Sequence, residues 1–228
     1  MKTPPLAQMK GPARQIRIEP RWPGGLAVLA TLLLAAILPE RISLFPAWVF
    51  YVLGVAVLAP MAGAGLTAGK GWWESLERTI TILFSLVVGA GTLANLAIVM
   101  SAMMHRPAEV SGMQLLASGV GVWITNVLAF SLLYWQLDRG GPGARENQEK
   151  RKPDWLFPQM GASEEAPHDW QPTFVDYLFL GFSTATAFST TDAVPLTSRA
   201  KMLMMLEASI SLVTIVVVAS RAINILGG

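Results

Sequence analysis

Hydroxyl and carboxyl side chains gather in one apolar part of this 228-residue chain. Residues 183 to 192 contain six hydroxyls and one acid, namely Ser183, Thr184, Thr186, Ser189, Thr190, Thr191 and Asp192. A further acid, Glu207, stands alone in the long apolar stretch that follows. Such groups can line a water-filled path, hold a cation or carry a proton, because hydrocarbon leaves them unsatisfied. The candidate polar or pore residues here are Ser189, Thr190, Thr191, Asp192 and Glu207.

Two asparagines, Asn95 and Asn126, also lie inside apolar stretches and complete the set of candidates. Hydrogen bonds between packed helices, worth about 0.6–2 kcal/mol each, explain both without any transport role. Two interpretations of Glu207 stay open. It either anchors the preceding segment by accepting from that segment's hydroxyls, or it faces a cavity as a cation or proton site. The hydroxyls can also bond to their own helix with no function at all.

The composition excludes several classes of protein. Hydrophobic residues make up 53% of the chain and charged residues only 14%, whereas about a quarter of a soluble domain is charged. The absence of cysteine excludes disulfides and thiolate metal sites. Basic residues stand beside apolar segments, which is a topology signal and not a nucleic-acid footprint. We therefore expect the lipid bilayer as the partner, with no nucleic acid, no metal and no cofactor.

Apolar segments of the chain predict an all-α, polytopic membrane helix bundle with about six transmembrane segments. They cover residues 24–38, 44–66, 79–103, 113–136, 174–189 and 200–226. The fifth is short and either crosses the membrane or re-enters like a pore helix. The predicted organisation is a basic tail (1–22), a four-helix membrane region (23–137), a polar loop (138–172) and a helix, turn and final transmembrane helix (173–228).

The distribution of lysine and arginine predicts the orientation of the chain. If all six segments cross, every basic residue except Arg41, Arg106, Arg199 and Lys201 falls on the side of the N-terminal tail. Cytoplasmic loops carry an excess of such residues. The sequence therefore predicts a bacterial inner-membrane protein with both termini in the cytoplasm.

The last quarter of the chain resembles the pore half of a tetrameric potassium channel. Asp176 and Tyr177 are similar to the start of its pore helix. The motif Thr-Ala-Phe-Ser-Thr-Thr-Asp, ending at Asp192, stands in the filter register, with Pro195 three residues later. Met205-Leu206-Glu207-Ala208 and Arg221 are similar to the inner helix of many bacterial relatives. The resemblance covers residues 176–224 and implies a pore-like fold of helix, turn and helix.

The filter itself departs from that family. Ser189 and Thr191 stand where the family has glycines. Potassium selectivity needs rings of backbone carbonyls from that turn. Glycine allows the left-handed backbone of the turn, whereas a β-branched threonine does not. The resemblance therefore does not imply potassium selectivity.

The whole chain also resembles a family of bacterial multi-pass inner-membrane proteins to which no activity has been assigned. The motifs that carry this resemblance are Trp-Ile-Thr-Asn (123–126), Trp-Gln-Leu-Asp-Arg-Gly-Gly-Pro (135–142), Pro-Asp-Trp-Leu-Phe-Pro-Gln-Met (153–160) and the Thr-Ala-Phe-Ser-Thr-Thr-Asp turn (186–192).

Two functions compete on this sequence. The first is a structural or regulatory membrane protein that keeps pore-like packing without conduction. In that case its polar residues pair within one subunit. The alternative is a non-selective or differently selective ion channel. That function requires a homo-oligomer, a tetramer by the resemblance, with four copies of Ser189–Asp192 facing one axis. An enzyme is not expected and no catalytic residue is predicted, since neither an HExxH motif nor paired intramembrane carboxylates occur.

Overall fold

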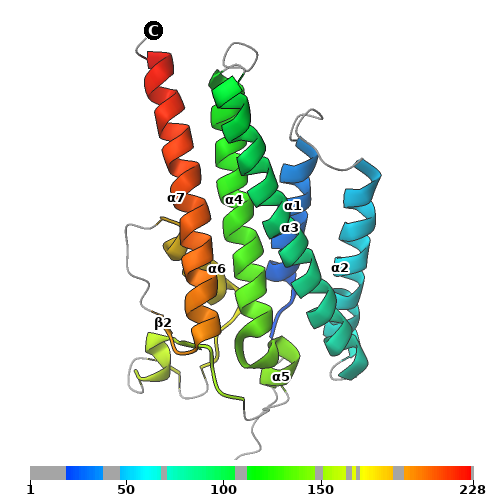
Figure 1. The fold of residues 1–228 in the computed structure, drawn as a ribbon. Helices are drawn as coiled ribbons and strands as arrows, with labels where there is room; N and C mark the ends of the chain where they lie inside the picture. The colour runs from blue at the N-terminus through cyan, green and yellow to red at the C-terminus, as the bar shows by residue number, and fades with distance from the viewer. Residues whose placement is uncertain are drawn as a thin grey trace, which may run out of the picture.

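Five long helices run lengthwise in the computed structural model and form a bundle (Figure 1). They are α1 (Trp22–Ile37), α2 (Ala47–Thr67), α3 (Gly71–His105), α4 (Gly112–Leu137) and α7 (Ser198–Leu226). The shorter elements are η1 (Asp138–Gly140), α5 (Pro142–Glu146), β1 (Trp155–Leu156), η2 (Pro158–Met160), α6 (Phe174–Thr186) and β2 (Val194–Pro195). The structure describes residues 19–37, 47–67, 71–105, 112–146, 151–162, 166–167, 170–186 and 193–226.

Three helical stretches are long and apolar enough to cross a membrane: Gly71–Ile98, Leu116–Glu146 and Ser198–Ser220. Two shorter apolar helices, Trp22–Ala36 and Tyr51–Leu66, lie beside them. The predicted all-α membrane bundle is confirmed at this coarse level, whereas about six crossings are not. The third predicted segment begins earlier than expected, because α3 already starts at Gly71.

The long helices are apolar outside and partly polar inside. On α7, Leu212 and Val216 are exposed, whereas Glu207, Ser211 and Thr214 are buried. Lipid is as apolar as leucine, so apolar burial does not drive these helices together. Packing and hydrogen bonds hold them together instead. Some buried hydroxyls are satisfied within their own helix. Thr214 Oγ1, for example, donates to Ile210 O at 2.8 Å.

One end of the bundle collects most of its charged side chains, and we call it the polar end. The start of α1 reaches α5 there, because the Arg21 guanidinium bonds to the Glu146 carboxylate. The start of α3 reaches the end of α4, since Arg78 Nε donates to Gln136 O at 3.3 Å. Strand β1 pairs antiparallel with β2, which brings the start of α7 to the same end.

Aromatic side chains fix the loop after α5 onto this end of the bundle. Trp155 is fully buried, with its ring 4.8 Å from that of Tyr134 on α4. The ring of Phe157 lies 5.4 Å from that of Tyr177 on α6. These contacts show that the apolar residues of the predicted polar loop dock onto the bundle, although Leu156 stays exposed.

Helix α6 enters the bundle from the polar end and stops partway. Its first turn lies beside the end of α4, where Tyr177 Oη donates to Asp138 Oδ2 at 2.6 Å. Its last turn lies beside the middle of α4, where Trp123 Nε1 donates to Ala185 O at 3.4 Å. The chain is back at the polar end by β2. Thirteen residues span only about 20 Å at 1.5 Å per residue, against roughly 30 Å of hydrocarbon.

Within the described residues, α6 is thus a half-length helix, and the described segments before and after it both lie at the polar end. The start of α1 lies at the polar end, and the end of α7 lies at the opposite end (Figure 1). The described bundle has five lengthwise helices, an odd number, and the placement of both termini in the cytoplasm stays a prediction.

Candidate functional site

Glu207 lies deep between α4, α6 and α7. Its side chain is fully buried. Oε2 accepts a hydrogen bond from Tyr134 Oη at 2.5 Å. Oε1 has no hydrogen-bond partner. The partner of this acid is therefore a phenol on the fourth helix. Two described hydroxyls of the fifth segment do not fill that role, since Thr184 and Thr186 donate to Leu180 O and Ser183 O of their own helix.

Asn126 of α4 contacts α7 at Glu207 and at Ser211, which lies one helical turn further along α7. Its Nδ2 donates to Ser211 Oγ at 2.9 Å and to Glu207 O at 3.2 Å. Asn126 is fully buried, and its Oδ1 has no partner. The structure thus brings together two of the predicted residues, Glu207 and Asn126. Their bonds join α4 to α7, which is the interhelical role expected of intramembrane polar groups.

Gly181 of α6 closes the third side of this cluster. A Cβ atom at this position would lie 2.4 Å from Ser131 Oγ and 3.3 Å from Glu207 Oε1. Contacts under 3.0 Å are not tolerated without a shift of the neighbouring atoms, so the backbone of α6 packs directly on the acid. In one chain the Glu207 carboxylate is therefore enclosed by three helices. Its Oε1 could accept one further proton or hydrogen bond.

The remaining predicted residues do not join this cluster. Asn95 on α3 is partly buried, and its Oδ1 has no partner. Ser189, Thr190, Thr191 and Asp192 lie outside the described residues, in the six-residue return from α6 to Ala193. Among the residues that the structure does describe, no group of three His, Cys, Asp or Glu could hold a metal ion.

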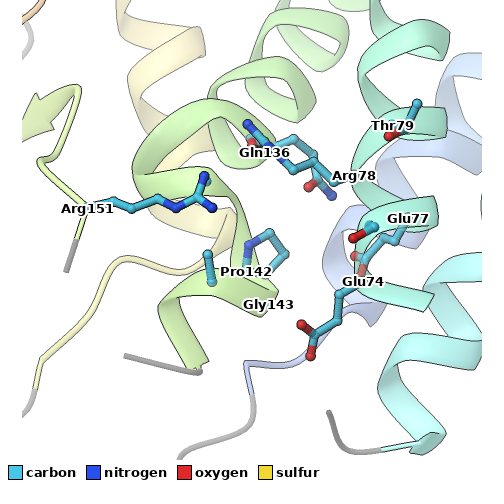
Figure 2. A pocket seen from close by; sticks show the side chains of 11 residues that line it. Glu74, Glu77, Arg78, Thr79, Gln136, Pro142, Gly143 and Arg151 are labelled. Atoms are coloured by element: carbon cyan, nitrogen blue, oxygen red, sulfur yellow. Dashed lines mark hydrogen bonds between the residues drawn. The ribbon is translucent and has the colours of Figure 1, made fainter. Parts of the chain in front are cut away.

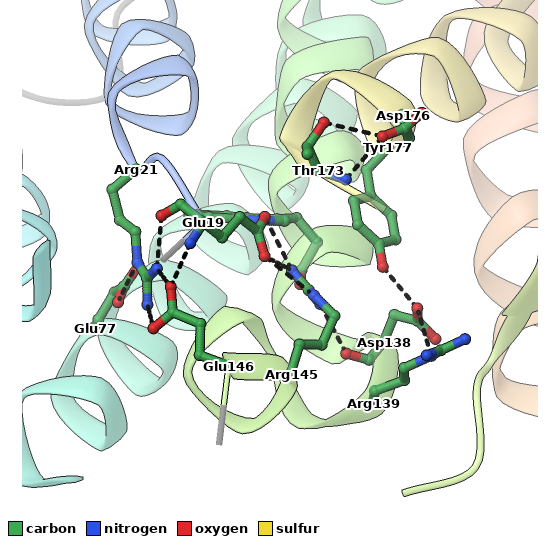
Figure 3. Close-up of polar contacts among 11 residues, drawn as sticks. Glu19, Arg21, Glu77, Asp138, Arg139, Arg145, Glu146, Thr173, Asp176 and Tyr177 are labelled. Atoms are coloured by element: carbon green, nitrogen blue, oxygen red, sulfur yellow. Dashed lines mark hydrogen bonds and ion pairs between the residues drawn. The ribbon is translucent and has the colours of Figure 1, made fainter. Parts of the chain in front are cut away.

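A second cluster, at the polar end, was not predicted from the sequence. Arg145 of α5 is its centre (Figure 3). The guanidinium is buried and makes three bonds of 3.0–3.2 Å to the carboxylate of Glu19. Its Nη1 also donates to the carbonyls of Trp135 and Asp138, each at 3.0 Å. One cation thereby ties the residues before α1 to the end of α4.

Arg21 forms the other half of this cluster. Its guanidinium bonds to the Glu146 carboxylate, and its Nε lies 3.6 Å from Glu77 Oε2 on α3. Burial alone lowers the pKa of Arg21. The hydrogen bond to Glu146 and the negative charges of Glu77, Glu146 and Glu19 outweigh burial, so its pKa lies above the ordinary value. Arg21 therefore stays charged at any accessible pH and links α1, α3 and α5.

Asp138 and Asp154 extend the network to the start of α7. Asp138 Oδ1 accepts from the Asp154 backbone N–H at 2.7 Å, while Oδ2 accepts from Tyr177. Asp154 in turn accepts from Thr197 Oγ1 at 2.6 Å and from the Arg199 guanidinium. Two carboxylates thus connect the end of α4 to β1, to α6 and to the first turn of α7.

Asp176 and Tyr177, which carry the likeness to a pore helix, have structural roles in this chain. Asp176 Oδ2 accepts from the backbone N–H of Thr173 at 2.7 Å and from its Oγ1 at 2.9 Å (Figure 3). The bond from Asp176 back to the Thr173 N–H is one half of a capping box and fixes the first turn of α6. Tyr177 anchors the same turn on Asp138.

The polar-end cluster was not predicted, because the arginines were used only to predict which side of the membrane each loop faces. A signal was nevertheless present. Acids accompany the arginines at the ends of the apolar segments, as Glu19 does with Arg21 and Glu146 with Arg145. Charged residues are almost never buried unless paired, so such neighbours at helix ends could have been tested as partners.

Comparison of the chain with protein-family models, with curated proteins and with solved structures finds no match.

Proposed function

We propose that this chain is an integral protein of a bacterial inner membrane with a structural or regulatory role. It crosses the bilayer with five helices and inserts α6 as a re-entrant helix from the cytoplasmic side. The re-entrant helix and α7 keep a pore-like arrangement that does not conduct within one chain. The resemblance of residues 176–224 to a channel pore, together with the half-depth insertion of α6, supports this proposal.

Enclosure of Glu207 is the observation that carries the non-conducting function. An acid that lines an ion path must face water. Here Tyr134 occupies one carboxylate oxygen, and the backbone at Gly181 lies against the other. Asn126 is likewise bonded to Ser211 within the chain. Pairing within one subunit is what a structural module requires.

Basic residues support the cytoplasmic assignment of the polar end. With a re-entrant α6, every lysine and arginine except Arg41, Arg106 and Arg221 belongs to a segment attached to that end. This asymmetry is larger than the one obtained from six crossings, and it follows the positive-inside rule. The C-terminus then faces the periplasm.

Cysteine labelling tests this topology cleanly, because the natural chain has no cysteine. Three single variants are needed: Lys152→Cys, Lys201→Cys and Gly228→Cys. In intact spheroplasts a membrane-impermeant maleimide should label only Gly228→Cys, and lysis should expose the other two. Labelling of Lys152→Cys and Lys201→Cys from opposite sides would mean that α6 crosses the membrane after all.

A second candidate function is conduction by an oligomer. This function requires several copies of the chain whose Ser189–Asp192 segments face one axis, as the resemblance to a channel pore implies. The outward faces of α6 and α7, with Phe179 and Met205 exposed, offer surface for such assembly. Non-selective or differently selective conduction would then use Asp192 and the neighbouring hydroxyls.

Ion flux into liposomes separates the two functions. We expect background flux from the reconstituted wild type, from Glu207→Gln and from Asp192→Asn, because Glu207 is enclosed within the described bundle. Empty liposomes and liposomes with a known cation ionophore set the two limits of the assay. Flux well above background that falls in Asp192→Asn would establish the channel and overturn the structural role.

A further inference from the structure

A polar cavity of 270 Å³ lies at the polar end, between the first turns of α3, the end of α4 and α5 (Figure 2). Its lining includes Glu74, Glu77 and Arg78 of α3, Gln136 of α4, and Arg151 from the loop after α5. Ligand sites typically hold about 300–1,000 Å³. The cavity lies just below this range, so it suits a group no larger than a small ligand or a lipid headgroup.

Two fully buried side chains of this lining have polar atoms without a hydrogen-bond partner, while the other oxygen of Glu77 lies 3.6 Å from Arg21 Nε. Glu77 is 1% exposed and Gln136 0% exposed. Glu77 Oε1 and both amide atoms of Gln136 have no partner. Leaving a buried polar group unsatisfied costs about 1–3 kcal/mol, so the cavity presents unmet acceptors and a donor to an incoming group.

The turn after α4 shapes the wall of this cavity. Gly140 and Gly141 have φ values of 89° and 95°, a left-handed region that favours glycine. A Cβ at Gly140 would lie 2.7 Å from the Arg151 guanidinium, and one at Gly141 would lie 2.9 Å from Gln136 Oε1. Glycine at these positions thus lets the backbone hold both side chains at the cavity.

Charges of both signs line the cavity, and α3 supplies both acids and one of the two arginines. Arg151 approaches from the side of the loop, and Arg78 lies beside Gln136, whereas Glu74 and Glu77 lie on the α3 side (Figure 2). Guanidinium groups suit phosphate oxygens. An ammonium offers three donors, which suit a carboxylate and an amide oxygen. The two acids would repel a simple anion in the cavity, and the two arginines would repel a simple cation.

We propose that this cavity binds a zwitterionic phosphoamine, with its phosphate toward Arg78 and Arg151 and its primary ammonium toward Glu77 and Gln136. An ethanolamine phospholipid headgroup and free phosphoethanolamine share this chemistry. The cavity lies where α3 and α4 leave the apolar region, so a membrane lipid can present its headgroup there. The site does not depend on whether the pore-like module conducts.

Titration of the detergent-purified full chain tests the proposal. The probes are short-chain phosphatidylethanolamine, phosphatidylcholine and phosphatidylglycerol, and free phosphoethanolamine and phosphocholine. Calorimetry or native mass spectrometry measures saturable binding. We expect the ethanolamine form to bind about tenfold more tightly than its trimethylated counterpart, because the latter has no N–H to donate. Binding of the lipid alone identifies a lipid site, and binding of both ethanolamine forms shows that the headgroup suffices.

Two lining variants and a matched control sharpen the test. Arg151→Ala should weaken ethanolamine binding about tenfold through loss of a charged hydrogen bond, and Glu77→Gln should reduce the preference for ethanolamine over choline. Arg151 is exposed, so its removal leaves the buried core intact. Lys201→Ala, another exposed basic residue at the polar end, should bind as the wild type does. Absence of saturable binding, equal binding of choline or glycerol headgroups, or an unchanged Arg151→Ala would overturn the proposal.

Discussion

Arg145→Met is expected to destabilise the bundle by about 3–5 kcal/mol, the cost of leaving a buried charge without its partner. Arg145 donates three bonds to Glu19 and two to backbone carbonyls, all at 3.0–3.2 Å. Its guanidinium also lies 5.2 Å from the centre of the Tyr177 ring. Removing it leaves the buried Glu19 carboxylate without its cation, with only the indole N–H of Trp135 as a side-chain donor among the described residues. It also takes one donor from each of two carbonyls, of which Asp138 O keeps the Gly141 N–H.

Thermal unfolding in detergent, followed by the monodisperse peak on size-exclusion chromatography, measures this loss. A fall in Tm on the order of 10 °C is expected, since 1 kcal/mol corresponds to roughly 2–4 °C for a chain of this size. Lys152→Ala, an exposed basic residue of the following loop, is the control and should change stability by less than about 0.5 kcal/mol.

The double variant Glu19→Gln/Arg145→Met separates charge from packing. With the acid neutralised, much of the loss should be recovered, because replacing a whole buried pair is far cheaper than breaking it. A single Arg145→Met that melts like the wild type would show that this cluster does not hold α1, α4 and α5 together.

Gly181→Ala is the second variant with a large expected effect. Overpacking a well-packed interior costs about 1–3 kcal/mol, and here the added methyl would lie 2.4 Å from Ser131 Oγ. Alanine is otherwise the better helix former by up to about 1 kcal/mol. A net loss of stability would therefore identify the close approach of α6 to α4. Gly181→Leu should be worse, because its side chain extends toward Glu207.

Gly89→Ala on α3 is the matched control, since nothing lies within 4 Å of its Cβ position. It should leave stability unchanged or raise it. The pair Gly181→Ala/Ser131→Ala removes the atom that the new methyl meets and should restore most of the loss. If Gly181→Ala were as stable as Gly89→Ala, then α6 would not pack on Glu207 as described, and the enclosure argument for a non-conducting module would fail.

The predicted helices and the described ones agree in type and differ in detail. The apolar stretches predicted at 113–136 and 200–226 correspond to α4 and α7, because long apolar runs are the strongest local signal of a membrane helix. The start of α3 was placed eight residues late. Its first turns carry Glu74, Glu77 and Arg78, which interrupt the apolar pattern but continue the helix.

The sequence identified the polar candidate residues but did not predict which residues they bond to. Glu207 and Asn126 stood out in the sequence because polar groups are rare in apolar segments. Tyr134 and Ser211 did not, although they bond to those two residues. Tyrosine and serine are ordinary residues in membrane helices. Only the packing of α7 against α4 turns them into partners.

The sequence by itself determined that this is a helical membrane chain, which of its intramembrane groups are polar, and that one end of it is basic. Those properties follow from residue type and local order. Tertiary structure alone decided that α6 stops partway along the bundle, that the start of α1 and the end of α7 lie at opposite ends of it, and that Glu207 is enclosed. Pairs such as Arg145 with Glu19 and β1 with β2 join residues distant in sequence. Such contacts depend on how helices pack, and no local pattern of residues records that packing.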